Sequence, residues 1–254
     1  MATERPVIVL IHGAWHPPHY YRKTIDLLRK QGYVVLAPPL PTTGLDDSVA
    51  GKTYVDDVKR VHEALLPHLD AGRQAVILCH SQGGIAGSAC VEGQTVEDRK
   101  TRGLDGGIKA VVYLAAFALS NHGASLMGDI GGKCAPFFSP DPEDPPFHKL
   151  NEKAANTFYN CLQPEEARQS LVDGLVYQSK ASQHAGAHFV ATDVTVPKTY
   201  IVCSEDQAIP REAQIHMAQA TGCEIVEITS DHSPFLQDDK NQEIVDVVFR
   251  VASK

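Results

Sequence analysis

A surplus of basic residues is missing from this sequence, and so are long apolar runs. Its 254 residues include 23 Lys and Arg against 31 Asp and Glu, which gives a formal net charge of −8. Nucleic acids and anionic membranes bind proteins through basic patches, so neither is an expected partner. No apolar stretch approaches the roughly 20 residues that span a bilayer. The chain start also lacks the pattern of a secretory signal peptide, and we expect a cytoplasmic protein.

Cysteine is scarce and scattered, with six residues and no Cys-x-x-Cys pair, which argues against a zinc site. In a reducing compartment most cysteines behave as small buried apolar groups. A disulfide between Cys134 and Cys161 is the alternative considered. His184 and His188 stand four residues apart, a spacing that could place two metal ligands on one helix face, but no third ligand is evident. We therefore expect no metal.

Short apolar runs alternate with longer amphipathic stretches along most of the chain. Continuous apolar runs are typical of parallel strands buried on both faces, and apolar residues at helical spacing indicate amphipathic helices. The expected strands are 7–11, 33–37, 74–79, 108–117, 199–204 and 224–228, and the expected helices are 20–31, 54–69, 85–92 and 242–251. This order predicts one α/β domain over residues 1–254, with a mostly parallel sheet flanked by helices.

The alternation of strands and helices breaks between Ser120 and Pro197. This stretch holds two adjacent glycines and a proline-rich run over 139–146, followed by helical patterns near 151–160 and 165–182. We interpret it as a partly helical cap, about residues 120–197, inserted over the sheet. Ligands usually bind at the carboxyl ends of parallel strands, so the cap is expected to cover a site for a small molecule.

Ser81 lies at the turn between an expected strand and an expected helix, in the run Cys-His-Ser-Gln-Gly-Gly. A strand–turn–helix with serine at its apex is the context of a nucleophile elbow. Small residues two places before and after the serine let strand and helix approach; these are Cys79, where glycine is usual, and Gly83. An ordinary serine–glycine turn is the alternative. Cys79 as nucleophile is a second one, but its place should direct it into the packing, and His80 is expected only to pack.

A serine nucleophile needs a general base, and twelve histidines compete for that role. His232 is favoured because it follows the last expected strand and so lies at the same sheet edge as Ser81. Asp206 follows the strand before it and can orient the histidine. The order Ser81, Asp206, His232 is that of α/β-hydrolases. Glu205 is the nearest competitor, whereas Asp231 is adjacent to the histidine and poorly aimed at its ring.

Acyl transfer places negative charge on the substrate oxygen, which backbone N–H groups can stabilise. The expected donors are the amide of Gln82, directly after the nucleophile, and that of Ala14 in the loop after the first strand. Gly13 allows the tight turn of that loop; the alternative is that it only ends the strand. We call residues 12–16 the first loop.

The substrate pocket is expected to be apolar and to need no cofactor. Candidate lining residues are Trp15, Phe117, Met127, Phe137 and Phe138, for each of which ordinary core packing is the alternative. No lysine or arginine is evidently aimed at the site, so a strongly anionic substrate is disfavoured. The sequence leaves a homodimer open.

Several of these segments resemble a known family. The run 11–16, the elbow at Ser81, the stretch 200–206 and the pair Asp231-His232 resemble the plant methylesterase and hydroxynitrile lyase branch of the α/β-hydrolases, and residues 106–117 resemble fungal α/β-hydrolases of that branch. The resemblance implies an α/β-hydrolase fold. The lyases have a threonine in the first loop and a lysine after the histidine, where this chain has Gly13 and Ser233. Both differences favour ester hydrolysis over cyanohydrin cleavage.

The expected activity is therefore that of a serine esterase acting through an acyl-enzyme on an ester, lactone or thioester. Fungal relatives often serve secondary metabolism, which makes polyketide-like intermediates plausible substrates. Two alternatives stay open. The same site could promote cyclisation, condensation or C–C cleavage, or the protein could be a ligand receptor on a hydrolase fold.

Overall fold

The computed structural model describes residues 4–132, 135–139, 143–173 and 176–254. Six strands form one sheet in the order β2-β1-β4-β5-β8-β9, and every neighbouring pair is parallel. They are β1 (Val7–Ile11), β2 (Val35–Leu36), β4 (Gln74–His80), β5 (Gly107–Leu114), β8 (Lys198–Cys203) and β9 (Glu224–Ile228). The predicted parallel sheet is confirmed, and the carboxyl ends of its strands lie at one edge.

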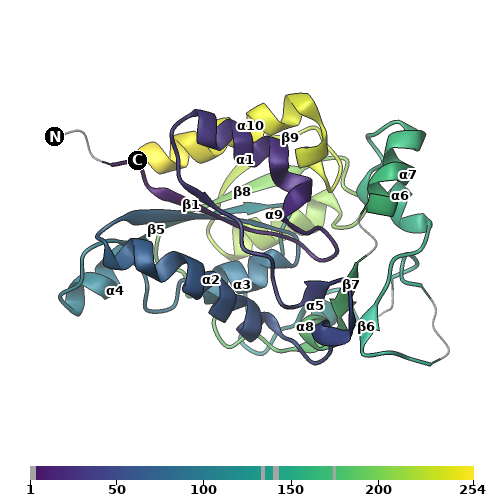
Figure 1. Ribbon diagram of the computed structural model, residues 1–254, viewed down its shortest axis with the longest axis horizontal. Coiled ribbons are helices and arrows are strands. Elements are labelled where there is room, and N and C mark those ends of the chain that lie inside the picture. The colour runs from purple at the N-terminus through teal and green to yellow at the C-terminus, as the bar shows by residue number, and fades with distance from the viewer. Residues whose placement is uncertain (1–3, 133–134, 140–142, 174–175) are drawn as a thin grey trace.

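Helices cover both faces of this sheet (Figure 1). One face packs against α1 (Arg22–Lys30) and α10 (Asp238–Ser253), and the other against α2 (Tyr54–Asp70), α3 (Gly83–Ala89) and α9 (Arg211–Ala220). Alternate residues of each strand point to opposite faces, so Val9 joins one apolar cluster and Leu10 the other. The remaining elements of the core are α4 (Val96–Thr101), η1 (Pro18–Tyr21), η2 (Asp47–Val49) and η3 (Pro234–Leu236).

The stretch predicted to form a cap contains both helices and strands. Its elements are α5 (Leu126–Asp129), β6 (Phe147–His148), α6 (Lys153–Phe158), α7 (Pro164–Asp173), β7 (Tyr177–Ser179) and α8 (Lys180–His184). A third strand, β3 (Thr43–Gly44), comes from outside this stretch and pairs antiparallel with β7, which also pairs with β6. Figure 1 shows α6 and α7 side by side at one end of the molecule.

The predicted helix over 165–182 is wrong over 177–179, where a strand separates α7 from α8. The helix α7 ends at Asp173, and β7 begins at Tyr177. Residues of β7 form a ladder with β3 and β6, and the amide of Ser179 donates to the carbonyl of Thr42 at 2.9 Å. Pairing with a distant strand therefore overrides the local apolar spacing.

Cys79 is accommodated by a glycine on the neighbouring helix α3. A β-carbon added at Gly87 would lie 2.8 Å from both Cβ and Sγ of Cys79, closer than such atoms approach. The usual glycine of the elbow has thus been replaced by cysteine, and the helix provides the missing space. Strand β4 and helix α3 still pack closely enough to form the turn between them.

This packing predicts that the effect of Gly87→Ala on stability changes sign with the residue at 79. In the wild-type chain the clash with Cys79 should outweigh the gain in helix propensity, because overpacking costs roughly 1–3 kcal/mol. With Cys79→Gly already present, the same substitution should stabilise the protein by up to about 1 kcal/mol. Urea unfolding of the two single variants and the double variant measures this coupling. Equal effects in both backgrounds would contradict the packing argument.

Candidate active site

Ser81 occupies a strained turn between β4 and α3. Its φ is +51°, a region that non-glycine residues adopt only when the surrounding structure holds them there. The amide of Ser81 donates to the carbonyl of Leu114 at 3.3 Å, and its own carbonyl accepts from the amides of Gly84 and Phe117 at 3.0 Å. The elbow is thus fixed by backbone bonds to β5 and the loop after it.

Gly83, two residues after the serine, has no space for a side chain. A β-carbon there would lie 2.5 Å from the carbonyl oxygen of His12 and 2.6 Å from that of Ile11. Both contacts are with backbone, which cannot move aside without disturbing β1. The turn therefore requires glycine at position 83, as the sequence analysis expected of a small residue there.

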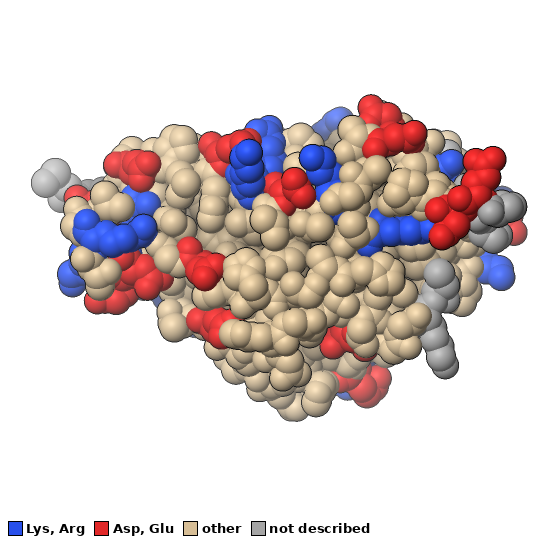
Figure 2. All heavy atoms as spheres, turned by 90° about the horizontal axis from the view of Figure 1, so that it is seen from below, with Lys and Arg blue, Asp and Glu red and all other residues tan. Residues whose placement is uncertain are grey.

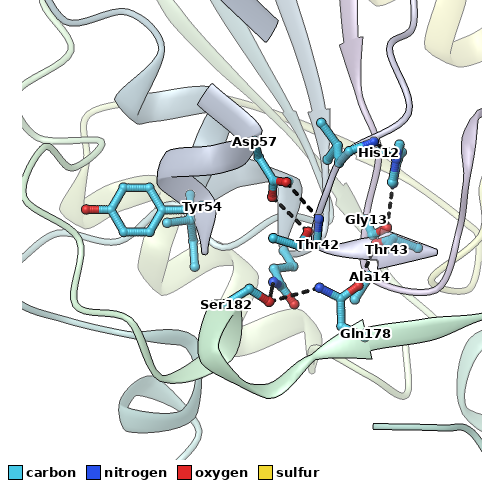
Figure 3. Close-up of a pocket in the computed structure, with 13 residues that line it drawn as sticks. His12, Gly13, Ala14, Thr42, Thr43, Tyr54, Asp57, Gln178 and Ser182 are labelled. Carbon is cyan, nitrogen blue, oxygen red and sulfur yellow. Dashed lines mark hydrogen bonds between the residues drawn. The ribbon is translucent and has the colours of Figure 1, made fainter. Parts of the chain in front are cut away.

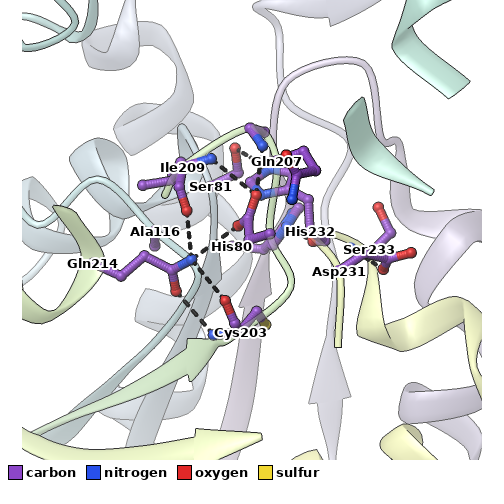
Figure 4. Close-up of polar contacts among 12 residues, drawn as sticks. His80, Ser81, Ala116, Cys203, Gln207, Ile209, Gln214, Asp231, His232 and Ser233 are labelled. Carbon is purple, nitrogen blue, oxygen red and sulfur yellow. Dashed lines mark hydrogen bonds and ion pairs between the residues drawn. The ribbon is translucent and has the colours of Figure 1, made fainter. Parts of the chain in front are cut away.

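The structure brings Ser81, His232 and Asp206 into one hydrogen-bonded chain, of which Figure 4 labels Ser81 and His232. His232 Nε2 lies 2.9 Å from Ser81 Oγ, and His232 Nδ1 lies 2.7 Å from Asp206 Oδ2. A carboxylate only accepts hydrogen bonds, so Nδ1 carries the proton and Nε2 is free to accept from the serine hydroxyl. Both side chains of the ion pair are almost completely buried. This arrangement can deprotonate the serine.

Asp206 is held by more than the histidine. Its Oδ1 accepts from the amides of Ala208 at 2.7 Å and Ile209 at 2.9 Å, and its Oδ2 accepts from Gln214 Nε2 at 3.0 Å. Gln214 is fully buried and also bonds the amide and carbonyl of Cys203 at the end of β8. It is a site residue that sequence reasoning missed.

The two competing acids do not occupy the position of Asp206. Glu205 is exposed. Asp231 is committed to backbone amides, because Oδ1 accepts from the amide of Ser233 at 2.9 Å and Oδ2 from the amide of Cys161 at 2.8 Å. Asp231 therefore shapes the loop that carries the histidine.

His80 does more than pack, contrary to expectation. Its Nε2–H donates to the backbone carbonyl of His232 at 2.9 Å, and its Nδ1 accepts from the hydroxyl of Tyr21 at 2.7 Å. That hydroxyl in turn accepts from the amide of Gly13 at 3.1 Å. Burial holds the pKa of His80 well below its usual range, so the ring stays neutral. One chain of hydrogen bonds thereby joins the first loop, the elbow and the His232 backbone.

The two buried histidines of the first loop, His12 and His16, fix the shape of that loop. His12 Nε2 accepts from the amide of Leu40 at 3.1 Å. His16 Nδ1 donates to the carbonyl of Ala14 at 2.7 Å, and its Nε2 accepts from the hydroxyl of Tyr159 at 3.0 Å. Burial lowers the pKa of His12 to about 4 and that of His16 to about 3. Both rings are neutral at physiological pH and act as fixed hydrogen-bonding groups.

The rival nucleophile, Cys79, is fully buried. Burial raises the pKa of its thiol well above the usual range, and Sγ donates to the carbonyl of Val112 at 3.4 Å. A neutral, inward-facing thiol is a poor nucleophile. The geometry at this turn therefore favours Ser81.

The amides of Ala14 and Gln82 are free to act on a ligand. Within the described ranges neither amide donates to another protein group, and both residues line the same cavity as Ser81. The amide of Gly13 is instead committed to Tyr21. The arrangement supplies two donors for a developing oxyanion.

The two positions that differ from the lyase pattern are closely packed. A β-carbon at Gly13 would lie 2.7 Å from His80 Nδ1 and 2.9 Å from Ser81 Cβ, so a threonine does not fit this loop. Ser233 is fully buried, with its amide bonded to Asp231. A lysine in its place would carry a buried charge. Both differences are therefore built into the packing around the site.

A cavity of about 450 Å³ opens onto Ser81 beneath the cap. Of the predicted lining residues, Trp15, Phe117, Phe137 and Phe138 line it. The prediction for Met127 is wrong: both Met127 and the preceding residue of α5, Leu126, pack in the core cluster, but only Leu126 also lines the cavity. Consecutive residues of a helix point in different directions, and sequence spacing alone could not choose between them.

The lining of this cavity is largely apolar. Phe158, which the sequence analysis did not single out, lies over the His232 ring with 5.4 Å between ring centroids. The polar lining side chains are those of Ser81, Gln82, Gln183, Gln207 and His232, and the lining includes no lysine, arginine, aspartate or glutamate among the described residues. Such a cavity suits a neutral and mostly apolar ligand.

A second, much smaller cavity of about 10 Å³ lies behind the first loop (Figure 3). Its volume is about that of one water molecule. Asp57 faces it, and the carboxylate accepts from the amide of Thr42 at 3.1 Å and from its hydroxyl at 2.8 Å. Burial raises the pKa of Asp57 to about 7. Asp57 therefore holds the backbone at Thr42, next to the first loop.

The wall of the small cavity connects the cap to the residue after the nucleophile. Thr43 Oγ1 donates to Gln178 Oε1 at 2.6 Å, and Gln178 Nε2 donates to Ser182 Oγ at 2.9 Å. The same hydroxyl accepts from Gln82 Nε2 at 2.7 Å. Helix α8 is thereby attached to the elbow.

Metal ligands are not assembled in the described part of the chain. No group of three or more His, Cys, Asp or Glu able to hold a metal occurs among the described residues. Helix α8 ends at His184, so His188 does not share its face; His188 lies 2.8 Å from both Tyr54 Oη and Glu92 Oε2. Cys134 lies outside the described residues, so the alternative of a disulfide with Cys161 is untested.

On the face shown in Figure 2, acidic and basic side chains are interspersed and no large basic area is visible. None of the helices in the described ranges combines the length and the apolar character needed to cross a membrane.

Comparison with known proteins agrees with this fold. The model of a family described as alpha/beta hydrolase matches residues 8–247. The alpha/beta hydrolase nvfD of Aspergillus novofumigatus is 26% identical over 235 residues, 91% of each chain. Methylesterase 1 of Arabidopsis thaliana is 24% identical over 97% of this chain and 95% of its own. The crystal structure of polyneuridine aldehyde esterase has a TM-score of 0.75 at 21% identity, covering 98% of this chain and 99% of that one, a likeness of fold.

Proposed function

The chain belongs to the alpha/beta hydrolase family, and on that premise we propose that it is a serine hydrolase that cleaves an ester, lactone or thioester of a small, mostly apolar molecule. The observation that carries the proposal is the hydrogen-bonded chain from Ser81 Oγ through His232 to Asp206, at the floor of an apolar cavity. The family resemblance to methylesterases and fungal hydrolases supports the same chemistry.

In the proposed reaction His232 Nε2 takes the proton of Ser81 as Oγ attacks the substrate carbonyl. The carbonyl oxygen becomes an oxyanion, and the amides of Ala14 and Gln82 stabilise it. His232 then gives its proton to the leaving alcohol, and an acyl-enzyme forms. Water attacks the acyl group in the second half, with His232 again taking and returning the proton. Asp206 keeps the ring in the tautomer that both halves require.

The apolar lining supports an uncharged acyl group. A carboxylate in this cavity would lose its hydration without gaining a cationic partner, since neither lysine nor arginine is among the described lining residues. Phe158 packs on the ring of the base, and Trp15 packs on Phe158 with 6.2 Å between ring centroids. Neutral esters should therefore be preferred over dicarboxylic monoesters.

The proposal is tested by hydrolysis of p-nitrophenyl acetate followed by acid quenching and peptide mass spectrometry. We expect release of p-nitrophenol and a transient acetyl group on the peptide that contains Ser81. A protein that neither releases p-nitrophenol nor reacts with a fluorophosphonate contradicts the proposal. Fluorophosphonate labelling of Ser81 without turnover of any ester would favour the alternatives, a receptor or a cyclisation, condensation or C–C cleavage enzyme.

A further inference from the structure

Gln183 is a buried side chain on the wall of the large cavity, and its amide is unpaired among the described residues. It comes from α8, is fully buried and lines the cavity that contains Ser81. Neither its Oε1 nor its Nε2 has a hydrogen-bond partner among the described residues. Buried amides are almost always paired, so an unpaired one calls for an explanation.

A second unpaired amide oxygen belongs to the same wall. Gln82 Oε1 is also buried without a partner in the described part of the chain, whereas Gln82 Nε2 is committed to Ser182. Ser182 precedes Gln183 on α8, so the bond between Gln82 and Ser182 attaches this helix to the residue after the nucleophile. Gln183 lines the large cavity and Gln82 lines both cavities, so their unused donors and acceptors lie in the wall between an apolar pocket and the elbow.

We propose, on the basis of the hydrolase function proposed above, that Gln183 together with Gln82 recognises an uncharged polar group of the substrate that both donates and accepts hydrogen bonds. A carboxamide is the simplest such group. Gln183 offers the N–H donors and one acceptor oxygen, and Gln82 offers a second acceptor oxygen. The terminal torsion of a glutamine is broad, so the amide plane can turn toward a ligand at little cost.

Charged groups match this wall poorly. A carboxylate has only acceptors, so it would leave the amide oxygens of Gln82 and Gln183 without a donor. An ammonium has only donors and would leave the Gln183 amide N–H groups unpaired. Neither charge would find a counter-ion among the described lining residues. A purely apolar acyl chain would leave both glutamines unsatisfied, which is how such sites reject analogues lacking the polar group.

The test compares p-nitrophenyl esters of acids that end in a carbamoyl group with esters that end in an isopropyl group of similar shape. Chains of two to five methylenes vary the reach. At the best length we expect Gln183→Leu to lower the ratio of kcat/KM, carbamoyl over isopropyl, by about 100-fold. The matched control, Gln219→Leu on the exposed side of α9, should leave that ratio unchanged. A ratio equal in wild type and Gln183→Leu at every length overturns the proposal.

Thermal unfolding separates recognition from a structural role. Gln183→Leu removes two unpaired buried polar atoms, so we expect a Tm equal to or above that of wild type. A fall of several degrees would mean that the amide serves the fold, and it would overturn the proposal.

A separate measurement applies if the wild-type protein cleaves no ester, in which case the proposed function has failed. Calorimetric binding of the corresponding methyl esters to Ser81→Ala then decides the inference. Tighter binding of the carbamoyl ester that is lost in Ser81→Ala/Gln183→Leu supports it, and equal binding of both esters overturns it.

Discussion

Ser81→Ala should lower kcat for p-nitrophenyl acetate by roughly 10⁴-fold or more, because the variant loses the atom that attacks the carbonyl. His232 and the amides of Ala14 and Gln82 remain, so weak catalysis through the oxyanion donors should persist above the rate in water. The backbone bonds from the elbow to Leu114 and Phe117 do not involve the hydroxyl, and the fold should be retained.

Steady-state kinetics, with a Tm measurement for folding, checks this result. The informative comparison is Cys79→Ala, which removes the rival nucleophile of the elbow. The Cys79 thiol is buried and bonded to a backbone carbonyl, so this variant should keep most of the activity. Loss of activity in Cys79→Ala together with retention in Ser81→Ala would transfer the nucleophile to the cysteine.

The sheet could be predicted because its physical signal is local. Strands buried on both faces are continuous apolar runs, and β1, which is completely buried, begins and ends at the predicted residues 7 and 11. The residues proposed for catalysis follow from the same signal, since Ser81, Asp206 and His232 each come directly after or shortly after a strand. Parallel strands bring their carboxyl ends to one edge of the sheet. The order of Ser81, Asp206 and His232 along the chain then assigned a role to each residue.

The cap could not be predicted in the same way, because long-range contacts determine it. Whether Tyr177–Ser179 becomes a strand depends on pairing with Thr43–Gly44, more than 130 residues earlier. Gln183 carries no sequence signal that separates a cavity-lining amide from a solvated one. Gln214 does carry one: it lies three and four residues before the buried Met217 and Ala218, on the apolar face of α9. A polar residue on such a face predicts a buried partner.

Asp206→Asn should lower kcat by about 10⁴-fold while leaving the fold intact. Four donors converge on this carboxylate: the amides of Ala208 and Ile209, Gln214 Nε2 and His232 Nδ1–H. An asparagine has one acceptor oxygen, so its NH₂ group must face one of these donors. If it faces the histidine, Nδ1 becomes the acceptor and the proton moves to Nε2, which can then no longer take the proton of the serine.

Glu205→Gln is the matched control, because it removes the same charge one residue earlier. Glu205 is exposed, and kcat should be unchanged within about twofold. Equal losses in both variants would mean that net charge near the site matters rather than the tautomer of His232. A loss confined to Glu205→Gln would assign the orienting role to that residue. The expected asymmetry follows from burial and hydrogen bonding, since only the Asp206 carboxylate is enclosed by donors that an amide cannot satisfy.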